Sequence, residues 1–206
     1  MSDHPRWIPL DTSSLDPDPF VAFDAWWDEA AALVREPEAI CVATADSSGQ
    51  PRARMVLLRA RDDRGYCFFT NYESRKGLDL AENPRASLLW YVEPLGRQIR
   101  IEGTVERLSA AESDAYFAGR PRGHQLGAHA SAQSRPIAAR ADLEARVDEV
   151  TRRFEGAEVP RPPSWGGYRV VPTHFEFWQH REDRLHDRIV YSPDPAGGWT
   201  ATRHQP

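Results

Sequence analysis

The chain has 206 residues, 40% of them hydrophobic, which is enough for one well-buried core. Its formal net charge of −5 argues against a general nucleic-acid binder, because affinity for a polyanion begins with a basic surface. No run of 18 apolar residues and no secretory signal occurs, so we expect a soluble, cytoplasmic protein without membrane contact.

The first half of the chain predicts one helix followed by a β-meander. Residues 1–15 are polar and contain proline, and we interpret them as a flexible arm before a single domain over residues 16–206. An amphipathic helix is predicted over 19–34, with Asp18 as N-cap and Pro19 at its first position. Turn residues separate three predicted antiparallel strands at 39–45, 52–60 and 66–71.

The second half predicts further strands interrupted by helices. A short helix over 74–82 precedes strands at 86–92 and 98–108. Ser109-Ala-Ala-Glu112 is a capping box that begins a helix through Phe117, and a longer helix is predicted over 136–154. Strands follow at 167–171, 174–179, 185–192 and 199–203. The fold class is therefore α+β, mainly β: a closed or split antiparallel barrel flanked by helices.

Cationic residues recur in segments whose predicted structure suits anion binding. Arg52 and Arg54 share one face of their predicted strand and Arg59 lies on the other, so they are either solvated or paired with anions. Ser74-Arg75-Lys76 begins a helix just after a strand ends, which is typical of a phosphate site but also of a solvated helix start. Lys76 is the single lysine of the chain.

Two later segments repeat this pattern. Tyr116, Arg120, Arg122 and His124 suit a phosphate monoester, although a cationic helix C-terminus would have the same composition. If residues 184–188 are extended, Arg184, His186 and Arg188 share one face. We favour an anion lying across them over an exposed edge strand defended by charge. Cys41 and Cys67 lie in apolar runs typical of buried free thiols, and no metal site is predicted.

Together these segments resemble the pyridoxine/pyridoxamine 5′-phosphate oxidase family from about Asp18 to Pro206. The motifs that carry the resemblance are Arg54-Met-Val-Leu-Leu-Arg59, Phe69-Thr70-Asn71, Ser74-Arg75-Lys76, Arg97-Gln98 with Gly103, Gln133-Ser134, Glu176-Phe-Trp178-Gln and Arg184-Leu-His186-Asp-Arg188. The resemblance implies a split antiparallel β-barrel that binds flavin mononucleotide (FMN) and a homodimer with each flavin at the subunit interface.

The resemblance also implies residue roles. Arg54, Arg75 and Lys76 would hold the FMN phosphate. The remaining implied cofactor contacts are Met55, Val56, Leu57, Leu58, Arg59, Phe69, Thr70, Gln98, Gln133, Ser134, Trp178 and Arg188. The implied substrate-binding residues are Arg59, Tyr116, Arg120, His124, Arg184 and His186, and of these Arg184 and His186 would be the catalytic pair that covers the substrate ring.

The implied reaction is oxidation of pyridoxine or pyridoxamine 5′-phosphate to pyridoxal 5′-phosphate. A hydride passes from C4′ to flavin N5, and O2 reoxidises the flavin to give H2O2. The chain departs from the family pattern at Arg59 and Ala132, where lysine is common, and at His124, where serine is common. Two alternatives stay open: a related flavin oxidase of the phenazine-biosynthesis type, and a non-catalytic protein that binds FMN or pyridoxal phosphate.

Overall fold

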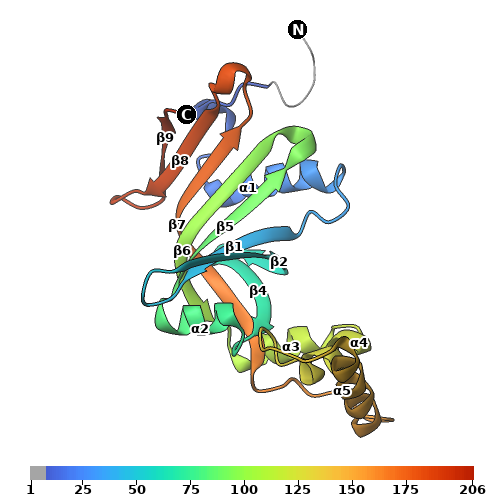
Figure 1. Cartoon of the computed structure of the whole chain (residues 1–206). Helices are drawn as coiled ribbons and strands as arrows, with labels where there is room; N and C mark the ends of the chain where they lie inside the picture. Colours follow the sequence, from blue (N-terminus) through green and yellow to red (C-terminus); the bar gives the residue numbers. More distant parts are fainter. Residues whose placement is uncertain (1–7) are drawn as a thin grey trace.

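The computed structural model describes residues 8–206, and within them one nine-stranded antiparallel sheet carries five α-helices. The strand order is β2-β1-β5-β6-β7-β4-β3, and β8 and β9 continue from β7. Figure 1 shows how the sheet curls, with α3 to α5 gathered at one end and β8 and β9 at the other. No helix in this part of the chain is long and apolar enough to cross a membrane.

The strands agree closely with the alternation in the sequence. They span Ala39–Ala45 (β1), Pro51–Leu57 (β2), Ala60–Asp62 (β3), Gly65–Asn71 (β4), Arg85–Val92 (β5), Arg97–Arg107 (β6), Trp165–Gln179 (β7), Asp187–Pro193 (β8) and Trp199–His204 (β9). The two strands predicted at 167–171 and 174–179 are one strand, β7. A register shift opposite Glu102 and Gly103 lets it pass through Pro172 without a break.

The helices are Pro19–Ala31 (α1), Arg75–Glu82 (α2), Ala110–Ala118 (α3), Arg122–Ala130 (α4) and Arg140–Arg153 (α5). The two predicted caps, Asp18 and Ser109, are confirmed, because each accepts a backbone N–H with its side chain, and Ser74 caps α2 in the same way. The longer helix predicted over 136–154 starts later than expected, since the Asp142 carboxylate accepts from the N–H of Ala139. Helix α4 was missed.

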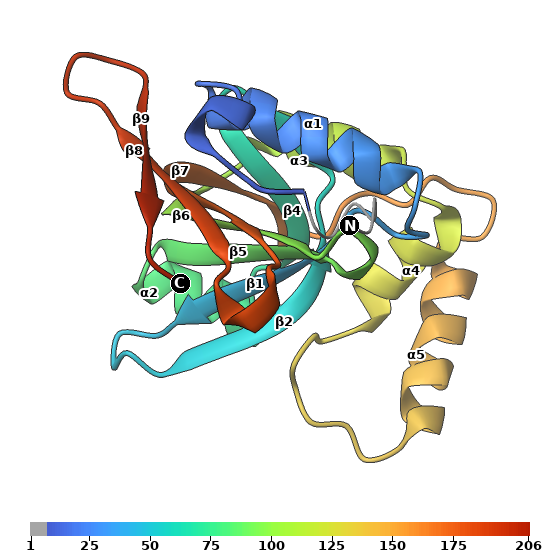
Figure 2. The same ribbon diagram turned by 90° about the horizontal axis from the view of Figure 1, so that it is seen from above.

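Helix α1 lies over one face of the sheet, as Figure 2 shows from above, and large aromatic side chains of the core pack between them. Phe23 of α1 is fully buried, with its ring 4.8 Å from Tyr66 of β4 and 5.7 Å from Trp90 of β5. Trp26 packs against Phe177 of β7 with ring centroids 5.1 Å apart. These large aromatic groups fix α1 on one face of the sheet, while α3 packs on the other face at β4, where Phe69 stacks on Tyr116.

The predicted arm covers residues 1–15, of which 1–7 lie outside the described residues. Leu10 and Leu15 are buried, and the Leu10 N–H donates to Asp187 at 3.0 Å. Arg203 of β9 donates to the Leu10 carbonyl at 2.6 Å. Packing against the C-terminal strands therefore begins by Leu10, ahead of the predicted domain start at residue 16.

Candidate active site

A cleft of about 1090 Å³ opens between β2, β4 and the helices α2, α3 and α4. It brings together residues predicted for both cofactor and substrate, from segments far apart in the sequence. The predicted residues that line it are Arg54, Met55, Val56, Leu57, Arg59, Phe69, Thr70, Lys76, Tyr116, Arg120, His124 and Gln133. The cleft is large enough for two small molecules of nucleotide size or less.

Lys76 provides a buried positive charge at the cleft floor. Its side chain is 7% exposed, and Nζ donates to Thr70 Oγ1 at 2.8 Å, Ser74 Oγ at 3.2 Å and Gln133 Oε1 at 3.2 Å. All three acceptors are neutral. Burial, together with the nearby Arg54 guanidinium, lowers the pKa of Lys76 to about 8. A bound anion would relieve this unfavourable charge.

The start of α2 is pressed against the end of β4. Gly77 allows this approach, because a Cβ there would lie 2.0 Å from the carbonyl oxygen of Tyr72. The Ser74 hydroxyl caps the helix. Arg75 stands exposed beside it and does not line the cleft. The helix N-terminus and Lys76 thus lie together at the cleft, with Arg75 exposed beside them, which is the arrangement expected of a phosphate site.

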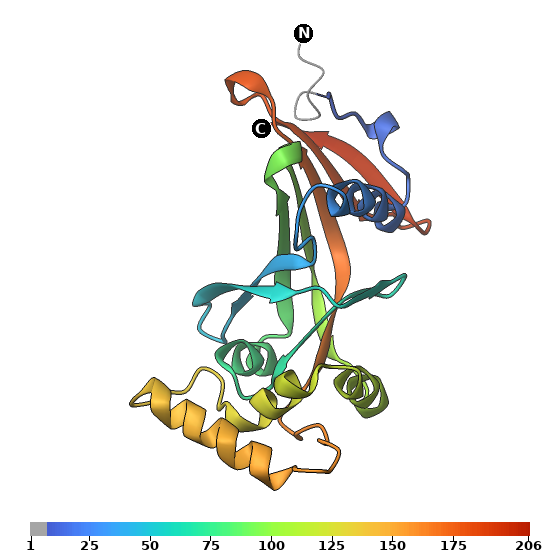
Figure 3. The same ribbon diagram turned by 90° about the vertical axis from the view of Figure 1, so that its right-hand side faces the viewer.

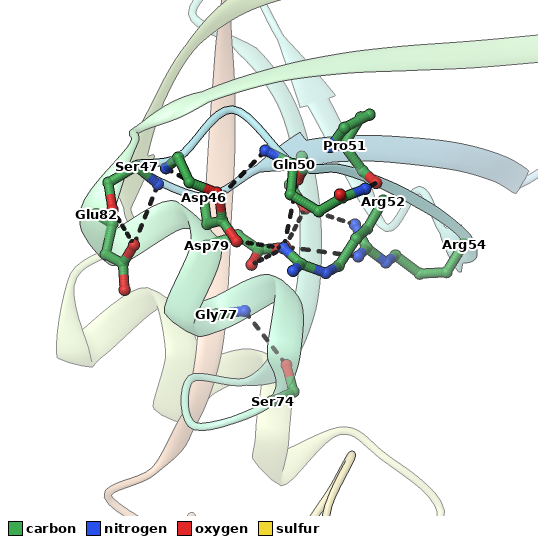
Figure 4. Close-up of polar contacts among 12 residues, drawn as sticks. Asp46, Ser47, Gln50, Pro51, Arg52, Arg54, Ser74, Gly77, Asp79 and Glu82 are labelled. Atoms are coloured by element: carbon green, nitrogen blue, oxygen red, sulfur yellow. Dashed lines mark hydrogen bonds and ion pairs between the residues drawn. The ribbon is translucent and has the colours of Figure 1, made fainter.

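The anionic partner expected for Arg52 and Arg54 is Asp79 of α2, which is 1% exposed (Figure 4). Arg52 Nη1 lies 3.0 Å from Asp79 Oδ1 and 2.9 Å from Asp46 Oδ2. Arg54 Nη2 lies farther away, 3.7 Å from Asp79 Oδ2. Two carboxylates within 3.0 Å therefore pair with the charge of Arg52. Arg54 lines the cleft and has no carboxylate that close among the described residues, so its charge is available to a bound anion.

A stack of aromatic rings forms another wall of the cleft. Phe69 and Tyr116 stack with centroids 3.8 Å apart, and Trp165 continues the stack 5.5 Å from Phe69. The Arg120 guanidinium lies 4.5 Å from the Trp165 ring, and burial lowers the pKa of Arg120. Its Nη1 atom is buried without a hydrogen-bond partner in the described part of the chain. A buried donor without a partner indicates that a ligand with an anionic group could bind beside Arg120, at a position in the cleft separate from Lys76.

Arg122 has a different role from the one that its sequence position indicated. It is the first residue of α4, and its guanidinium donates to the carbonyl oxygens of Phe154 at 2.6 Å and Ala157 at 3.0 Å. These bonds tie α4 to the end of α5. Arg122 does not line the cleft, so of the two arginines in this segment only Arg120 faces it.

The remaining predicted residues lie outside the cleft. Leu58 is buried in the core, and Ser134 follows Gln133 without lining the cleft. Gln98, Trp178 and Arg188 lie opposite one another in the register of β6, β7 and β8 and so form one row across the sheet. The row lies at the end of β7 and the start of β8. Figure 3 shows these strand ends at the opposite end of the molecule from α3 to α5.

The prediction that Arg184, His186 and Arg188 alternate along one strand was wrong. Glu182–Arg184 form a 3-10 turn in which Asp183 and Arg184 have φ of 53° and 60°, and β8 begins only at Asp187. His186 closes this turn, because its Nδ1 accepts the N–H of Arg181 at 3.1 Å, and its ring lies 4.6 Å from Trp178. Burial and nearby positive groups lower the pKa of His186.

Across β2, β1, β5 and β6, the sheet face opposite α1 carries exposed apolar side chains. Met55, Cys41, Leu89 and Arg100 pair in register across β2, β1, β5 and β6 and so share this face. Met55 is 63% exposed and Tyr91 of β5 is 53% exposed. On the same face Glu176 is buried and accepts from Arg100 at 3.1 Å and Arg188 at 2.5 Å. An exposed apolar surface of this kind is typical of an interface.

These features define the class of protein: an antiparallel split barrel with a cleft lined by cationic side chains. The chain matches the family described as pyridoxamine 5′-phosphate oxidase over residues 26–154 and the pyridoxine 5′-phosphate oxidase C-terminal dimerisation region over residues 165–206. The chain belongs to this pyridoxine/pyridoxamine 5′-phosphate oxidase family.

Individual relatives agree with that assignment. The pyridoxine/pyridoxamine 5′-phosphate oxidase of Bordetella petrii is 59% identical over 189 residues, covering 91% of this chain and 89% of the relative. The enzyme of that name from Cupriavidus taiwanensis is 57% identical, covering 96% and 93%. These proteins are similar over nearly their whole length, so the family's oxidoreductase class extends to this chain.

Two solved structures share the fold. PhzG from Burkholderia lata 383, determined with tetrahydrophenazine-1-carboxylic acid, superposes with a TM-score of 0.89 at 36% identity, covering 98% of this chain and 100% of that one. A pyridoxamine 5′-phosphate oxidase-related, FMN-binding protein from Nostoc punctiforme superposes with a TM-score of 0.70 at 17% identity, covering 90% and 95%. The predicted split-barrel fold is confirmed.

Proposed function

We propose that this protein oxidises pyridoxine 5′-phosphate or pyridoxamine 5′-phosphate to pyridoxal 5′-phosphate in the cytoplasm, with FMN as cofactor and O2 as oxidant. The observation that carries the proposal is the pair of cationic centres in one cleft. Lys76 and Arg54 provide one, and Arg120 with its unpartnered Nη1 provides the other. Two phosphate groups, one on the cofactor and one on the substrate, would satisfy both centres.

The residues present fit FMN at the first centre. Arg54, Lys76 and the start of α2 would hold its phosphate, and Arg75 would reach it from the rim. Thr70, Gln133 and the backbone of residues 55–59 would contact the rest of the molecule. When bound, FMN supplies the acceptor for the hydride and passes the electron pair to O2, giving H2O2.

The second centre fits the phosphate of a B6 vitamer. Tyr116 and Arg120 would grip it, with Arg59 and His124 at the edge of the cleft. The chain's role in the reaction is positioning: holding C4′ near the hydride acceptor converts an encounter into an intramolecular step. With pyridoxine 5′-phosphate, C4′ loses a hydride and its hydroxyl a proton, and both electrons leave on H2O2.

We also propose that the working form is a homodimer. Gln98, Trp178 and Arg188 lie in a row outside the cleft of their own chain, and the sheet face opposite α1 carries exposed Met55 and Tyr91. In a two-fold dimer this row, together with Arg184 and His186, would complete the cleft of the second copy. The family's description of residues 165–206 as a dimerisation region supports this arrangement.

A phenazine-type activity is the second candidate, because PhzG superposes over nearly the whole chain. The unpartnered Arg120 atom favours a phosphorylated substrate, and the relatives named for B6 oxidation are more similar at 59% identity than PhzG at 36%. A non-catalytic FMN-binding or pyridoxal-phosphate-binding role predicts no turnover at all.

One assay separates these candidates. Purified protein, loaded with FMN, is mixed with pyridoxine 5′-phosphate, pyridoxamine 5′-phosphate or unphosphorylated pyridoxine under O2, and H2O2 is measured. We expect peroxide from at least one phosphorylated vitamer and little from pyridoxine. Turnover of a reduced phenazine carboxylic acid alone would favour the second candidate, and no peroxide from any of them would favour a binding role.

A further inference from the structure

Arg54 is oriented by a hydroxyl group that neither the sequence motifs nor the family comparison singles out. Thr44 of β1 is 3% exposed and lies beside Arg54 on the same side of the β1–β2 pair. Its Oγ1 accepts from Arg54 Nη1 at 2.7 Å and donates to Asp79 Oδ2 at 2.7 Å. The buried carboxylate thus acts on Arg54 through the threonine.

The other contacts of Arg54 are longer. Nη1 lies 3.3 Å from the Val42 carbonyl oxygen, and Nη2 lies 3.7 Å from Asp79 Oδ2, beyond a normal hydrogen bond. Asp79 is also shared, because its Oδ1 accepts from Arg52 at 3.0 Å. The short bond that orients Arg54 is therefore the one to Thr44.

From this geometry we infer that Thr44 is a positioning residue that presents Arg54 to the phosphate of the bound cofactor, with Asp79 fixing the direction of the threonine hydroxyl. A carboxylate at 2.7 Å would neutralise Arg54, and the phosphate would have to displace it. A hydroxyl orients the guanidinium without cancelling its charge. Arg52 shows the contrast, since Asp46 and Asp79 hold it within 3.0 Å.

This inference rests on the proposal that the cofactor is FMN, and the test uses riboflavin, which lacks only the phosphate. Thr44→Val is nearly isosteric and changes no charge, whereas Thr44→Ser keeps the hydroxyl and is the matched control. Dissociation constants for FMN and riboflavin are measured with the full-length cofactor-free protein by quenching of flavin fluorescence.

For Thr44→Val we expect FMN to bind about tenfold more weakly, the size of one hydrogen bond to a charged group, with riboflavin affinity unchanged within about twofold. Thr44→Ser should bind both flavins as wild type does. In an Arg54→Met background, Thr44→Val should add less than about twofold, because the group it positions is gone.

Two results would overturn the inference while leaving the proposed function intact: equal weakening of FMN and riboflavin by Thr44→Val, or no weakening of either. A wild-type protein that binds no FMN would instead refute the proposed cofactor and the inference with it. Should Thr44→Val fail to fold, as judged by circular dichroism, Thr44→Ala removes the same hydroxyl and is read in the same way.

Discussion

Replacing Lys76 with methionine should stabilise the cofactor-free protein while weakening its affinity for FMN. Lys76 is 7% exposed, and among residues 8–206 its amine donates only to neutral oxygens. Burial and Arg54 lower its pKa from 10.5 to about 8. At 1.36 kcal/mol per pH unit, keeping Lys76 charged at pH 7 costs about 3 kcal/mol. Loss of the three hydrogen bonds, at the low end of about 0.5 kcal/mol each, removes part of this, and we expect Lys76→Met to gain about 1–2 kcal/mol in unfolding free energy.

The measurements are urea unfolding of the cofactor-free protein and a fluorescence titration with FMN. The pKa of Lys76 in the folded protein, about 8, lies below the 10.5 of the unfolded chain, so between these values the unfolded chain binds more protons. The stability of wild type relative to Lys76→Met should therefore rise as the pH rises from 8 to 10.5.

FMN affinity of Lys76→Met should fall about 10- to 100-fold through loss of a charge-assisted bond to phosphate. Arg75→Met is the control for stability, because Arg75 is exposed at the same helix start and its unfolding free energy should stay within about 0.5 kcal/mol of wild type. Lower stability of the cofactor-free Lys76→Met protein, combined with wild-type FMN affinity, would refute the reasoning.

Two further predictions concern the substrate. Arg120→Met should raise KM for pyridoxine 5′-phosphate about 10- to 100-fold and leave the flavin spectrum unchanged. Arg122→Met should leave KM near wild type, because the Arg122 guanidinium donates to the backbone carbonyls of Phe154 and Ala157 and does not line the cleft. Equal KM values in the two variants would remove Arg120 from the phosphate site. Arg184→Ala and His186→Ala should each lower kcat/KM about 10- to 1,000-fold with FMN still bound, and wild-type turnover by both would remove this turn from the active site.

Elements specified by local signals were predicted closely. Strand β1 has the predicted bounds, and α1 begins at Pro19 behind the Asp18 cap, because alternation and capping depend on residues close in sequence. The capping box of Ser109 and Glu112 is present with both of its bonds. Lys76 was singled out on similar grounds, since a lysine at a helix start after a strand needs no long-range information to be noticed.

The features that the sequence did not predict depend on contacts between residues far apart in the chain. Helix α4 is short and rich in glycine and histidine, and Arg122 holds it by bonding to carbonyls about 30 residues away. The turn before β8 depends on αL backbone at Asp183 and Arg184, which alternation does not reveal. Thr44, Asp79 and Trp165 acquire roles only through partners on other elements: the hydroxyl and carboxylate meet across 35 residues, and Trp165 meets Arg120 across 45.

The proposed division of the site between two copies allows a test by complementation. Lys76 lies in the cleft. Arg188 lies outside it, in the row with Gln98 and Trp178, and pairs with Glu176 at 2.5 Å. Lys76→Met and Arg188→Met should each be nearly inactive at limiting FMN. In a mixed dimer, one site would carry both changes and the other neither. Random reassortment makes about half of the dimers mixed, so unfolding and refolding the two variants together should restore about one quarter of wild-type activity. Arg188→Met leaves Glu176 bonded to Arg100 at 3.1 Å, so its fold should survive. If each chain holds a complete site, no mixture will exceed the activity of the separate variants.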